Sequence, residues 1–330
     1  MLEHGGDLTR ASKEYGIRKE DWLDLSTGIN PLGYPVPAVP AQDWLRLPDD
    51  SNPVLLQTAR DYYQADWLLP VAGSQAAIRA LPRIRPRSRV LVSALTYNEH
   101  AHAWQRGGHA VQAVRMRECE AHLSQTDVLI VCNPNNPTGE LIERAQLLEW
   151  HANLAAHGGW LIVDEAFIDA MPEASAAPLA TRPGLIVLRS LGKFFGLAGA
   201  RVGFAFASAD LLRALGDELG PWTVSGPAQF AACEALSNRV WRAQTCDALT
   251  RAGQRLNALL ARAGVGAQGT ALFQWWQDER ADQLHRELAR KAILTRRFQQ
   301  AKPNGIRFGL PGIEEEWQRL ERALEGFTKC

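Results

Sequence analysis

A single lysine, Lys193, stands in a stretch of sequence that suits covalent chemistry. It follows an apolar run at residues 185–188, is framed by glycines, and is followed by Arg201. A lysine between a buried strand and a glycine-rich turn can lose its proton and form a Schiff base with a carbonyl compound. Arginine supplies a permanently charged fork for a phosphate group. The stretch therefore predicts covalent binding of a phosphorylated carbonyl cofactor, although a lysine in a surface loop would look similar.

Two further apolar runs lead into polar side chains. Residues 127–132 precede a turn that contains Asn136, and residues 160–164 end in Asp164. In open α/β sheets ligands lie outside the carboxyl ends of the strands. An acid there can keep a pyridine nitrogen protonated and an asparagine can donate to a ring oxygen, which are the needs of pyridoxal phosphate. Each motif alone also fits a simpler structure, a plain turn for Asn136 and a helix cap for Asp164.

A third motif lies upstream, at residues 71–78. The chain runs there from Gly73 into a predicted helix that we expect Ser74 to cap. The exposed N–H groups at the start of such a helix attract anions, so this segment is predicted to bind a phosphate.

Strands and helices alternate from about residue 70 to residue 210. Apolar runs at residues 89–93, 110–114, 127–132, 161–164, 185–188 and 202–207 are typical of buried strands. Residues 141–157 carry apolar side chains at helical spacing and end at two glycines, which predicts a helix. This alternation predicts an α/β fold with a mostly parallel sheet covered by helices.

The last third of the chain has a different pattern. Beyond Pro221 it is predicted to be helical through about residue 263. Short strands are then expected at residues 272–276, 292–295 and 305–308, with a helix at residues 281–291. We therefore predict an N-terminal arm over the active site (1–35), a large cofactor-binding domain (36–220) and a smaller α+β C-terminal domain (221–330).

The composition fits an enzyme that acts on small molecules. The 330 residues include 36 acidic and 36 basic side chains, so no net charge attracts nucleic acid or anionic lipid. Five cysteines without a C-x-x-C spacing argue against a disulfide framework or a zinc site, so no metal is expected. No signal peptide and no membrane-spanning run is recognisable. The expected location is a reducing compartment, the cytoplasm.

Together these motifs resemble the aspartate aminotransferase superfamily, the fold type I enzymes that use pyridoxal 5′-phosphate, over nearly the whole chain. The resemblance implies a sheet of seven strands sandwiched by helices, and a homodimer. It implies that Lys193 is the Schiff-base lysine, Asp164 the partner of the pyridinium nitrogen, and Asn136 a donor to the ring hydroxyl. The other cofactor-binding residues that it implies are Tyr97 over the ring and Gly73, Ser74, Gln75, Ser190 and Arg201 around the phosphate.

The N-terminus resembles that of one branch, the threonine-phosphate decarboxylases of cobalamin biosynthesis. A histidine and two glycines at residues 4–6 are followed by a second motif at residues 24–33 that contains an Asn-Pro pair. Glycines there would let backbone amides and an imidazole approach an anionic substrate. The substrate-binding residues that this branch implies are His4, Gly5, Asn30, Arg296 and Arg307.

The arginines divide between two anionic groups in this resemblance. Arg307 would bind the substrate carboxylate and Arg296 the substrate phosphate, with Arg297 as the alternative for the phosphate. Phe167 also fits the branch, because many aminotransferases have a tyrosine there that donates to the cofactor. One departure is Leu47, which replaces a tyrosine that usually reaches the cofactor phosphate of the neighbouring subunit.

The reaction that the resemblance implies is the decarboxylation of L-threonine O-3-phosphate to (R)-1-amino-2-propanol O-2-phosphate by a carbon–carbon lyase. The bond held perpendicular to the cofactor ring is the one that breaks. The arginines and His4 orient the substrate, so they determine which reaction takes place. A transaminase similar to histidinol-phosphate aminotransferase uses the same cofactor residues and is the alternative. A non-catalytic sensor is a third hypothesis, which the lack of a basic tail or DNA-binding segment disfavours. The sequence does not separate threonine phosphate from serine phosphate.

Overall fold

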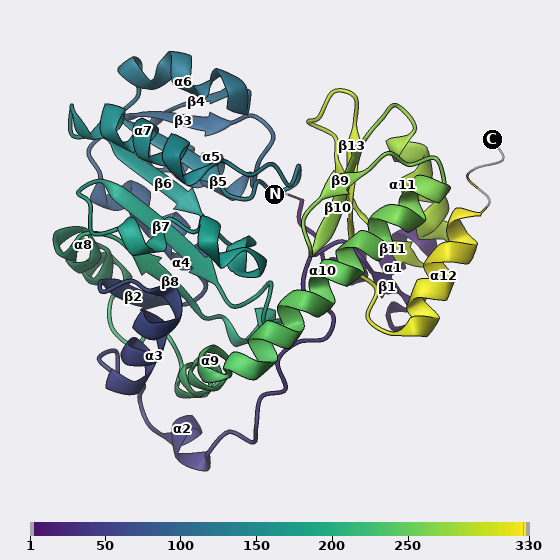
Figure 1. Cartoon of the computed structure of the whole chain (residues 1–330), viewed down its shortest axis with the longest axis horizontal. Helices are drawn as coiled ribbons and strands as arrows, with labels where there is room; N and C mark the ends of the chain where they lie inside the picture. The colour runs from purple at the N-terminus through teal and green to yellow at the C-terminus, as the bar shows by residue number, and fades with distance from the viewer. Residues whose placement is uncertain (1–2, 326, 328–330) are drawn as a thin grey trace. The chain divides into compact units, whose positions relative to one another are not determined.

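The computed structural model of the protein describes residues 3–325 and 327, which form two compact units. The larger unit comprises Gly33–Asn136 and Glu140–Ala243. The smaller unit comprises the chain up to Leu32, the short segment Pro137–Gly139, and the chain from Gln244 onward. Figure 1 labels the elements of both units. Every helix in the described part of the chain is too short or too polar to cross a bilayer.

The larger unit is built around a sheet of seven strands in the order β2-β8-β7-β6-β5-β3-β4. Neighbouring strands from β7 to β4 are parallel, whereas β8 is antiparallel to both β7 and β2. The predicted fold class and its mostly parallel sheet are therefore confirmed. The strands are β2 (Leu68–Val71), β3 (Arg89–Ser93), β4 (Ala110–Val114), β5 (Val128–Cys132), β6 (Trp160–Asp164), β7 (Leu185–Ser190) and β8 (Gly203–Phe206).

The middle strands β5 and β6 are buried at every position, which explains why both are continuous apolar runs rather than alternating ones. The helices between the strands begin and end at local signals, such as Asn52, whose side chain caps the helix that starts at Pro53. They are α2 (Ala41–Leu45), α3 (Pro53–Tyr63), α4 (Ser74–Ala80), α5 (Glu99–Arg106), α6 (Cys119–His122), α7 (Arg144–Ala155), α8 (Ala209–Leu219) and α9 (Gly226–Ser237).

The smaller unit is an α+β structure, as the sequence predicts. Its antiparallel sheet has the order β12-β13-β10-β9, and β1 pairs with β11 in a separate parallel ribbon. The strands are β1 (Leu23–Asp24), β9 (Gln268–Gly269), β10 (Phe273–Gln277), β11 (Ile293–Leu294), β12 (Arg296–Phe298) and β13 (Gly305–Gly309). The helices are α1 (Leu8–Tyr15), α11 (Ala281–Arg290), α12 (Glu314–Leu324) and most of α10 (Arg239–Arg262).

Candidate active site

A pocket of about 150 Å³ lies in the larger unit, at the carboxyl ends of β5, β6 and β7. Every residue predicted to bind the cofactor lines this pocket except Gly73, the residue before Ser74. The structure therefore brings together side chains that are scattered over more than a third of the sequence. The lining residues are Ser74, Gln75, Tyr97, Cys132, Asn136, Asp164, Ala166, Phe167, Ser190, Lys193 and Arg201.

Asp164 is the last residue of β6, and its carboxylate is held from two sides. Oδ2 lies 2.8 Å from Nε2 of His100, and Oδ1 accepts a hydrogen bond from the N–H of Ala166 at 3.1 Å. Burial by itself would lower the pKa of His100, but hydrogen bonds to Asp164 and Cys132 outweigh burial and raise this pKa to about 10. A charged imidazole favours an ionised carboxylate, which is the form that accepts a hydrogen bond from a protonated ring nitrogen.

The raised pKa of His100 predicts that the cofactor-free protein loses stability in alkali. The pKa of His100 is about 10 in the folded chain and 6.5 for an unperturbed histidine. The stability that the charged His100 contributes is therefore fully present below about pH 6.5 and is lost as the pH rises toward 10. We expect the free energy of unfolding in urea to decrease over this range, and to decrease less in His100→Gln. Equal pH dependence in the two proteins would contradict the raised pKa.

Lys193 follows β7 on a tight turn that two backbone hydrogen bonds hold in place. The N–H of Gly196 donates to the carbonyl of Lys193 at 3.2 Å, and the N–H of Tyr34 donates to the carbonyl of Phe195 at 2.8 Å. Phe194 and Phe195 are buried. Nζ of Lys193 lies 5.3 Å from the centre of the Phe167 ring. The amine is thus presented to the pocket next to an apolar surface.

Arg201 lines one end of the pocket, and Gly73 lies directly beside its guanidinium. Gly73 has a positive φ of 70°, and a Cβ at this position would lie 2.6 Å from Nη2 of Arg201. Nη1 of Arg201 donates to the carbonyl of Ala198 at 3.1 Å, which fixes the guanidinium beside the glycine. Only glycine leaves this space open, and the guanidinium beside it suits a phosphate.

The predicted capping role of Ser74 is wrong. The structure makes Gly73 the N-cap of α4 and Ser74 its first residue, so the capping position has no side chain that could accept a hydrogen bond. The physical reason is the left-handed backbone of Gly73 and its close approach to Arg201, which together require a glycine at the cap.

Polar contacts fix the walls of the pocket. The hydroxyl of Tyr97 donates to Oε1 of Gln75 at 3.1 Å, and Nε2 of Gln75 donates to Oε2 of Glu99 at 2.6 Å. The turn that carries Asn136 is held through Asn135, whose N–H donates to a backbone carbonyl at 2.7 Å and whose Oδ1 accepts from a threonine hydroxyl at 2.8 Å. The side chains that face the cofactor site are therefore fixed by neighbours in the larger unit.

The smaller unit brings most of the predicted substrate residues together around Ser26. Nη2 of Arg307 donates to the carbonyl of Ser26 at 2.7 Å, and the N–H of Gly6 donates to its Oγ at 2.7 Å. A Cβ at Gly5 would lie 2.4 Å from the carbonyl oxygen of Ser26, so the N-terminal segment packs there only as glycine. Burial, and to a smaller extent the nearby charge of Arg296, lower the pKa of Arg307 to about 9.

Arg296 contacts a carboxylate from the N-terminus. Its Nη1 lies 3.5 Å from Oε2 of Glu3, and Oε1 of Glu3 accepts a hydrogen bond from Nη1 of Arg10 at 2.8 Å. Glu3, Arg10 and Arg296 line a polar pocket of the smaller unit, and His4 lines it too. The hydrogen bond from Arg10 lowers the pKa of Glu3, and the charge of Arg296 lowers it too. Burial acts in the opposite direction but is outweighed. This pocket already accommodates one anionic group.

The register of the smaller sheet separates the two neighbouring arginines. Arg296 pairs with Arg307 between β12 and β13, whereas Arg297 pairs with Ile306. Because residues directly opposite share a face, Arg296 lies on the same face of the sheet as Arg307, and Arg297 starts from the other face. Both Arg296 and Arg297 line the polar pocket that contains Glu3, so the register distinguishes them only by their neighbour Arg307. Asn30 is also buried in this unit, and its Oδ1 accepts a hydrogen bond from the N–H of Leu32 at 2.9 Å.

Residues 22–326 match the model of the family described as aminotransferase class I and II. The chain belongs to this family. A relative from Pseudomonas aeruginosa named threonine-phosphate decarboxylase is 54% identical over 100% of this chain and 99% of its own length. One with the same name from a Sinorhizobium species is 43% identical over 98% of this chain and 97% of its own length.

A solved structure has the same fold as this chain. It is histidinol-phosphate aminotransferase from Sinorhizobium meliloti in complex with pyridoxal-5′-phosphate, and its sequence is 18% identical. It covers 100% of this chain and 98% of its own, with a TM-score of 0.83.

Pyridoxal 5′-phosphate, the cofactor of this aminotransferase family, fits the pocket residues. The decisive feature is the space beside Arg201 that a side chain at Gly73 would fill, because a phosphate needs both the space and the charge. Lys193 offers an amine, and Asp164 offers a carboxylate that His100 orients. The roles assigned to individual residues remain predictions.

Cys132 and Ala166 belong to this aminotransferase site although neither was predicted from the sequence. Both line the pocket, and each is close in sequence to a motif residue. Their position at the ends of β5 and β6 was the available signal, because residues at the carboxyl ends of parallel strands face ligands. Neither residue type carries a distinctive charge, so composition alone did not single them out.

Proposed function

We propose that this chain is a threonine-phosphate decarboxylase that converts L-threonine O-3-phosphate to (R)-1-amino-2-propanol O-2-phosphate and carbon dioxide, as a step of cobalamin biosynthesis. The observation that carries the proposal is the 54% identity, over essentially both full lengths, to a relative with that name. The pocket supports it because its residues fit pyridoxal 5′-phosphate. A Mycobacterium bovis relative named histidinol-phosphate aminotransferase is 31% identical over 80% of this chain and 74% of its own length, so the transaminase alternative has less support.

Residues of the larger unit carry the cofactor chemistry in this proposal. Bound pyridoxal phosphate supplies an electron sink for the electron pair that carbon dioxide leaves behind. Asp164, oriented by His100, keeps the ring nitrogen protonated, and Arg201 binds the phosphate. Nζ of Lys193 binds the cofactor covalently and later donates the proton that replaces the carboxylate at Cα.

Residues of the smaller unit recognise the anionic groups of the substrate in this proposal. Arg307 binds the carboxylate. Burial disfavours the positive charge of Arg307, and an anion next to it offsets this cost. Arg296 binds the phosphate, because its guanidinium already forms an ion pair with the carboxylate of Glu3. His4 and Gly5 belong to the segment that packs on Ser26 and complete the recognition of the phosphate.

The proposed reaction is tested with purified protein loaded with pyridoxal phosphate. We expect L-threonine O-3-phosphate to yield carbon dioxide and aminopropanol phosphate over many turnovers without any 2-oxo acid. Mass spectrometry follows both products. Turnover that required histidinol phosphate and 2-oxoglutarate instead would identify a transaminase and overturn the proposal.

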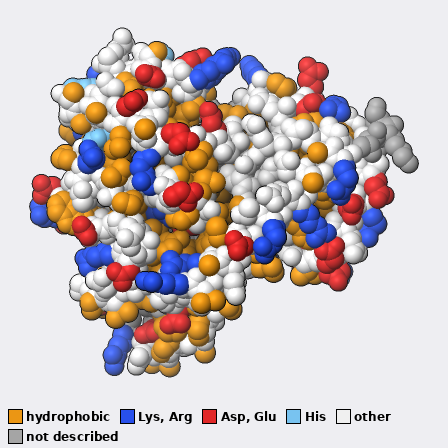
Figure 2. Space-filling model, viewed as in Figure 1, with side chains coloured by type: hydrophobic (Ala, Val, Ile, Leu, Met, Phe, Trp, Pro, Cys, Tyr) orange, Lys and Arg blue, Asp and Glu red, His pale blue; other side chains and the backbone are white. Residues whose placement is uncertain are grey.

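We propose further that two copies of the chain form a homodimer. Large apolar side chains are exposed around α2 in the larger unit, including Trp44, Leu45, Leu47 and Val54, and Leu45 is 84% exposed. Figure 2 shows hydrophobic side chains on the lower rim, where Figure 1 places α2. Clusters of exposed apolar side chains mark interaction sites. Light scattering is expected to give twice the chain mass of 36.4 kDa, and a monomer at micromolar concentration would contradict the proposal.

We propose the cytoplasm as the location of the protein. Cys119, Cys132 and Cys233 are free thiols. Free thiols are typical of proteins in a reducing compartment. Fractionation of the native host, with activity recovered outside the cytoplasm, would contradict this location.

A further inference from the structure

Behind the cofactor pocket, a buried network of charged side chains joins the ends of β6 and β7. Asp164 pairs with Leu188 in the register of these strands, so the next residues, Glu165 and Arg189, come together at the strand ends. Successive residues of a strand point to opposite faces of the sheet. Asp164 and Ser190 therefore face the pocket, while Glu165 and Arg189 face the other side of the same sheet.

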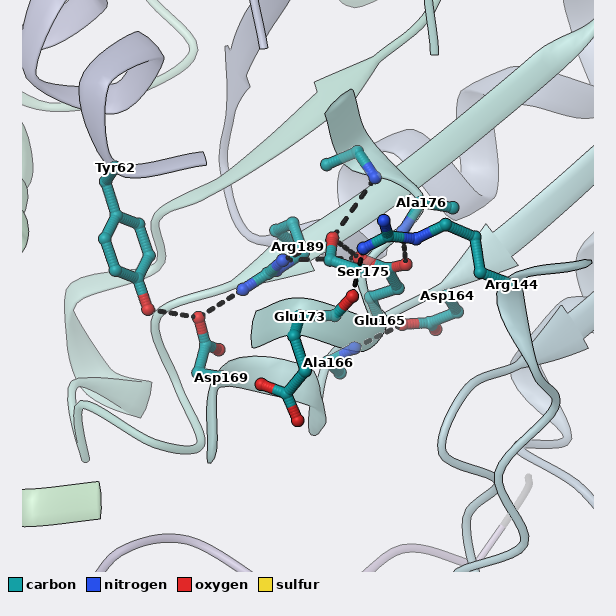
Figure 3. A network of polar contacts seen from close by, with 11 residues as sticks. Tyr62, Arg144, Asp164, Glu165, Ala166, Asp169, Glu173, Ser175, Ala176 and Arg189 are labelled. Atoms are coloured by element: carbon teal, nitrogen blue, oxygen red, sulfur yellow. Dashed lines mark hydrogen bonds and ion pairs between the residues drawn. The ribbon is translucent and has the colours of Figure 1, made fainter. Parts of the chain in front are cut away.

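The contacts of Arg189 extend this network, as Figure 3 shows. Its Nη1 lies 3.2 Å from Oε2 of Glu165 and donates to Oγ of Ser175 at 3.0 Å. Its Nη2 donates to Asp169, whose Oδ1 also accepts a hydrogen bond from the hydroxyl of Tyr62 at 2.8 Å. Ser175 in turn donates to Oε2 of Glu165 at 2.5 Å. A single guanidinium is thus shared by two carboxylates.

Stability alone is a poor explanation for this network. The side chains of Arg189, Glu165 and Asp169 are 2%, 0% and 1% exposed, so three charges have lost their hydration. Nε of Arg189 and Oδ2 of Asp169 are buried and make no hydrogen bond within the described part of the chain. Apolar side chains of similar volume often stabilise a core as well as a buried ion pair does. A network that is costly and only partly satisfied calls for another role.

The network also reaches the turn that carries Lys193. Tyr62, which donates to Asp169, packs edge-on against Phe195 with 5.8 Å between the ring centres. Phe195 lies two residues beyond Lys193 on the same turn. Arg189 is itself the residue before Ser190, the last residue of β7. The network therefore contacts both ends of the segment that presents Lys193 and Ser190 to the pocket.

We propose that Arg189, Glu165 and Asp169 are positioning residues that hold the ends of β6 and β7 in register and so fix Asp164, Ser190 and Lys193 around the cofactor. None of the three touches the pocket, so they act only through the strands and through Tyr62. The charge-assisted contacts suit this task because they are directional, whereas apolar packing would let the strand ends slide. The proposal rests on the proposed function in one respect, that the pocket binds pyridoxal phosphate.

The test compares Asp169→Asn with the unchanged protein, both loaded with pyridoxal phosphate. Asparagine keeps the size of the side chain and an acceptor for Tyr62 but removes the charge that holds Nη2 of Arg189. We expect a weaker circular dichroism band of the bound cofactor, because the band depends on a fixed asymmetric environment. We also expect kcat for L-threonine O-3-phosphate to fall about tenfold while KM stays within about twofold, because misplaced groups lower the rate of chemistry rather than binding.

Asp127→Asn is the matched control. Asp127 pairs with Arg89 at 2.8 Å before the start of β5, at the opposite end of the same sheet. This control makes the same chemical change to an ion pair and is expected to leave both the dichroism band and kcat unchanged. A purely structural role for the network predicts that Asp169→Asn lowers the melting temperature but leaves the band and kcat per loaded pocket as they are in the control, and this result would overturn the proposal.

Tyr62→Phe provides a second variant in case Asp169→Asn does not fold. It removes one hydroxyl and keeps the aromatic contacts with Phe195, and we expect the same changes with a smaller fall in kcat of about threefold. An unchanged band and kcat in this folded variant would also overturn the proposal. The dichroism band is read without substrate, so the positioning role is still tested if the protein releases no carbon dioxide and the proposed function fails.

Discussion

Lys193→Ala is expected to lower the turnover of L-threonine O-3-phosphate by about a thousandfold or more, the largest effect of any single substitution in the pocket. The proposed role of this lysine is double, since it binds the cofactor covalently and returns a proton to Cα. Neighbouring side chains do not replace it, because Lys193 is the single lysine between residues 33 and 243 of the sequence. Stopped-flow measurement of carbon dioxide release gives the rate.

A second measurement separates loss of chemistry from loss of the fold. Borohydride treatment of the loaded protein, followed by peptide mapping, should place the reduced cofactor on the peptide that contains Lys193. Lys19→Ala, a change to an exposed lysine in the smaller unit, is the matched control and should retain full activity and labelling. Substantial turnover by Lys193→Ala would refute the assignment, whereas cofactor-dependent binding of a preformed adduct without turnover in the unchanged protein would favour a sensor.

The strands of the larger unit could be predicted because their signals are local. Residues 89–93 and 110–114 coincide with β3 and β4, and the apolar run at 127–132 contains β5. The strands β3 and β5 are buried at nearly every position and are continuous apolar runs, which are recognisable in one sequence. The edge strand β4 is mostly exposed, so the prediction that it is buried is wrong although its bounds agree. The cofactor residues could be predicted for a related reason, since the ends of these strands meet at one edge of the sheet.

The end of β7 shows why other features could not be predicted. The apolar run stops at Leu188, and the strand was predicted to stop there, but β7 continues through Arg189 to Ser190. A charged residue continues a buried strand only because Glu165 and Asp169 neutralise it, and both lie about 20 residues away in the sequence. Such a partnership depends on tertiary contacts that no local pattern reveals.

The smaller unit shows the same limit in its register. The sequence predicts one strand at residues 292–295, whereas the structure forms β11 at Ile293–Leu294 and β12 at Arg296–Phe298, with different partner strands. Thr295 lies between them, and its hydroxyl contacts Nδ1 of His285 at 2.8 Å. Register decides which arginine shares a face with Arg307, and a shift of one residue would exchange Arg296 for Arg297. The sequence alone therefore left that assignment open.

Arg296→Ala is expected to lower kcat/KM for L-threonine O-3-phosphate by about a hundredfold, because it removes one partner of a largely buried, charge-assisted contact with the phosphate. The structure favours Arg296 over Arg297 because Arg296 shares a face with Arg307 and already binds the Glu3 carboxylate. Arg297→Ala is the matched control, with the same change one residue along the strand, and kcat/KM should stay within about threefold. Inorganic phosphate should inhibit the unchanged protein and the Arg297 variant competitively but lose this effect in the Arg296 variant. The opposite pattern, with loss of activity and of phosphate inhibition only in Arg297→Ala, would transfer the phosphate site to Arg297 and refute the assignment made from the register.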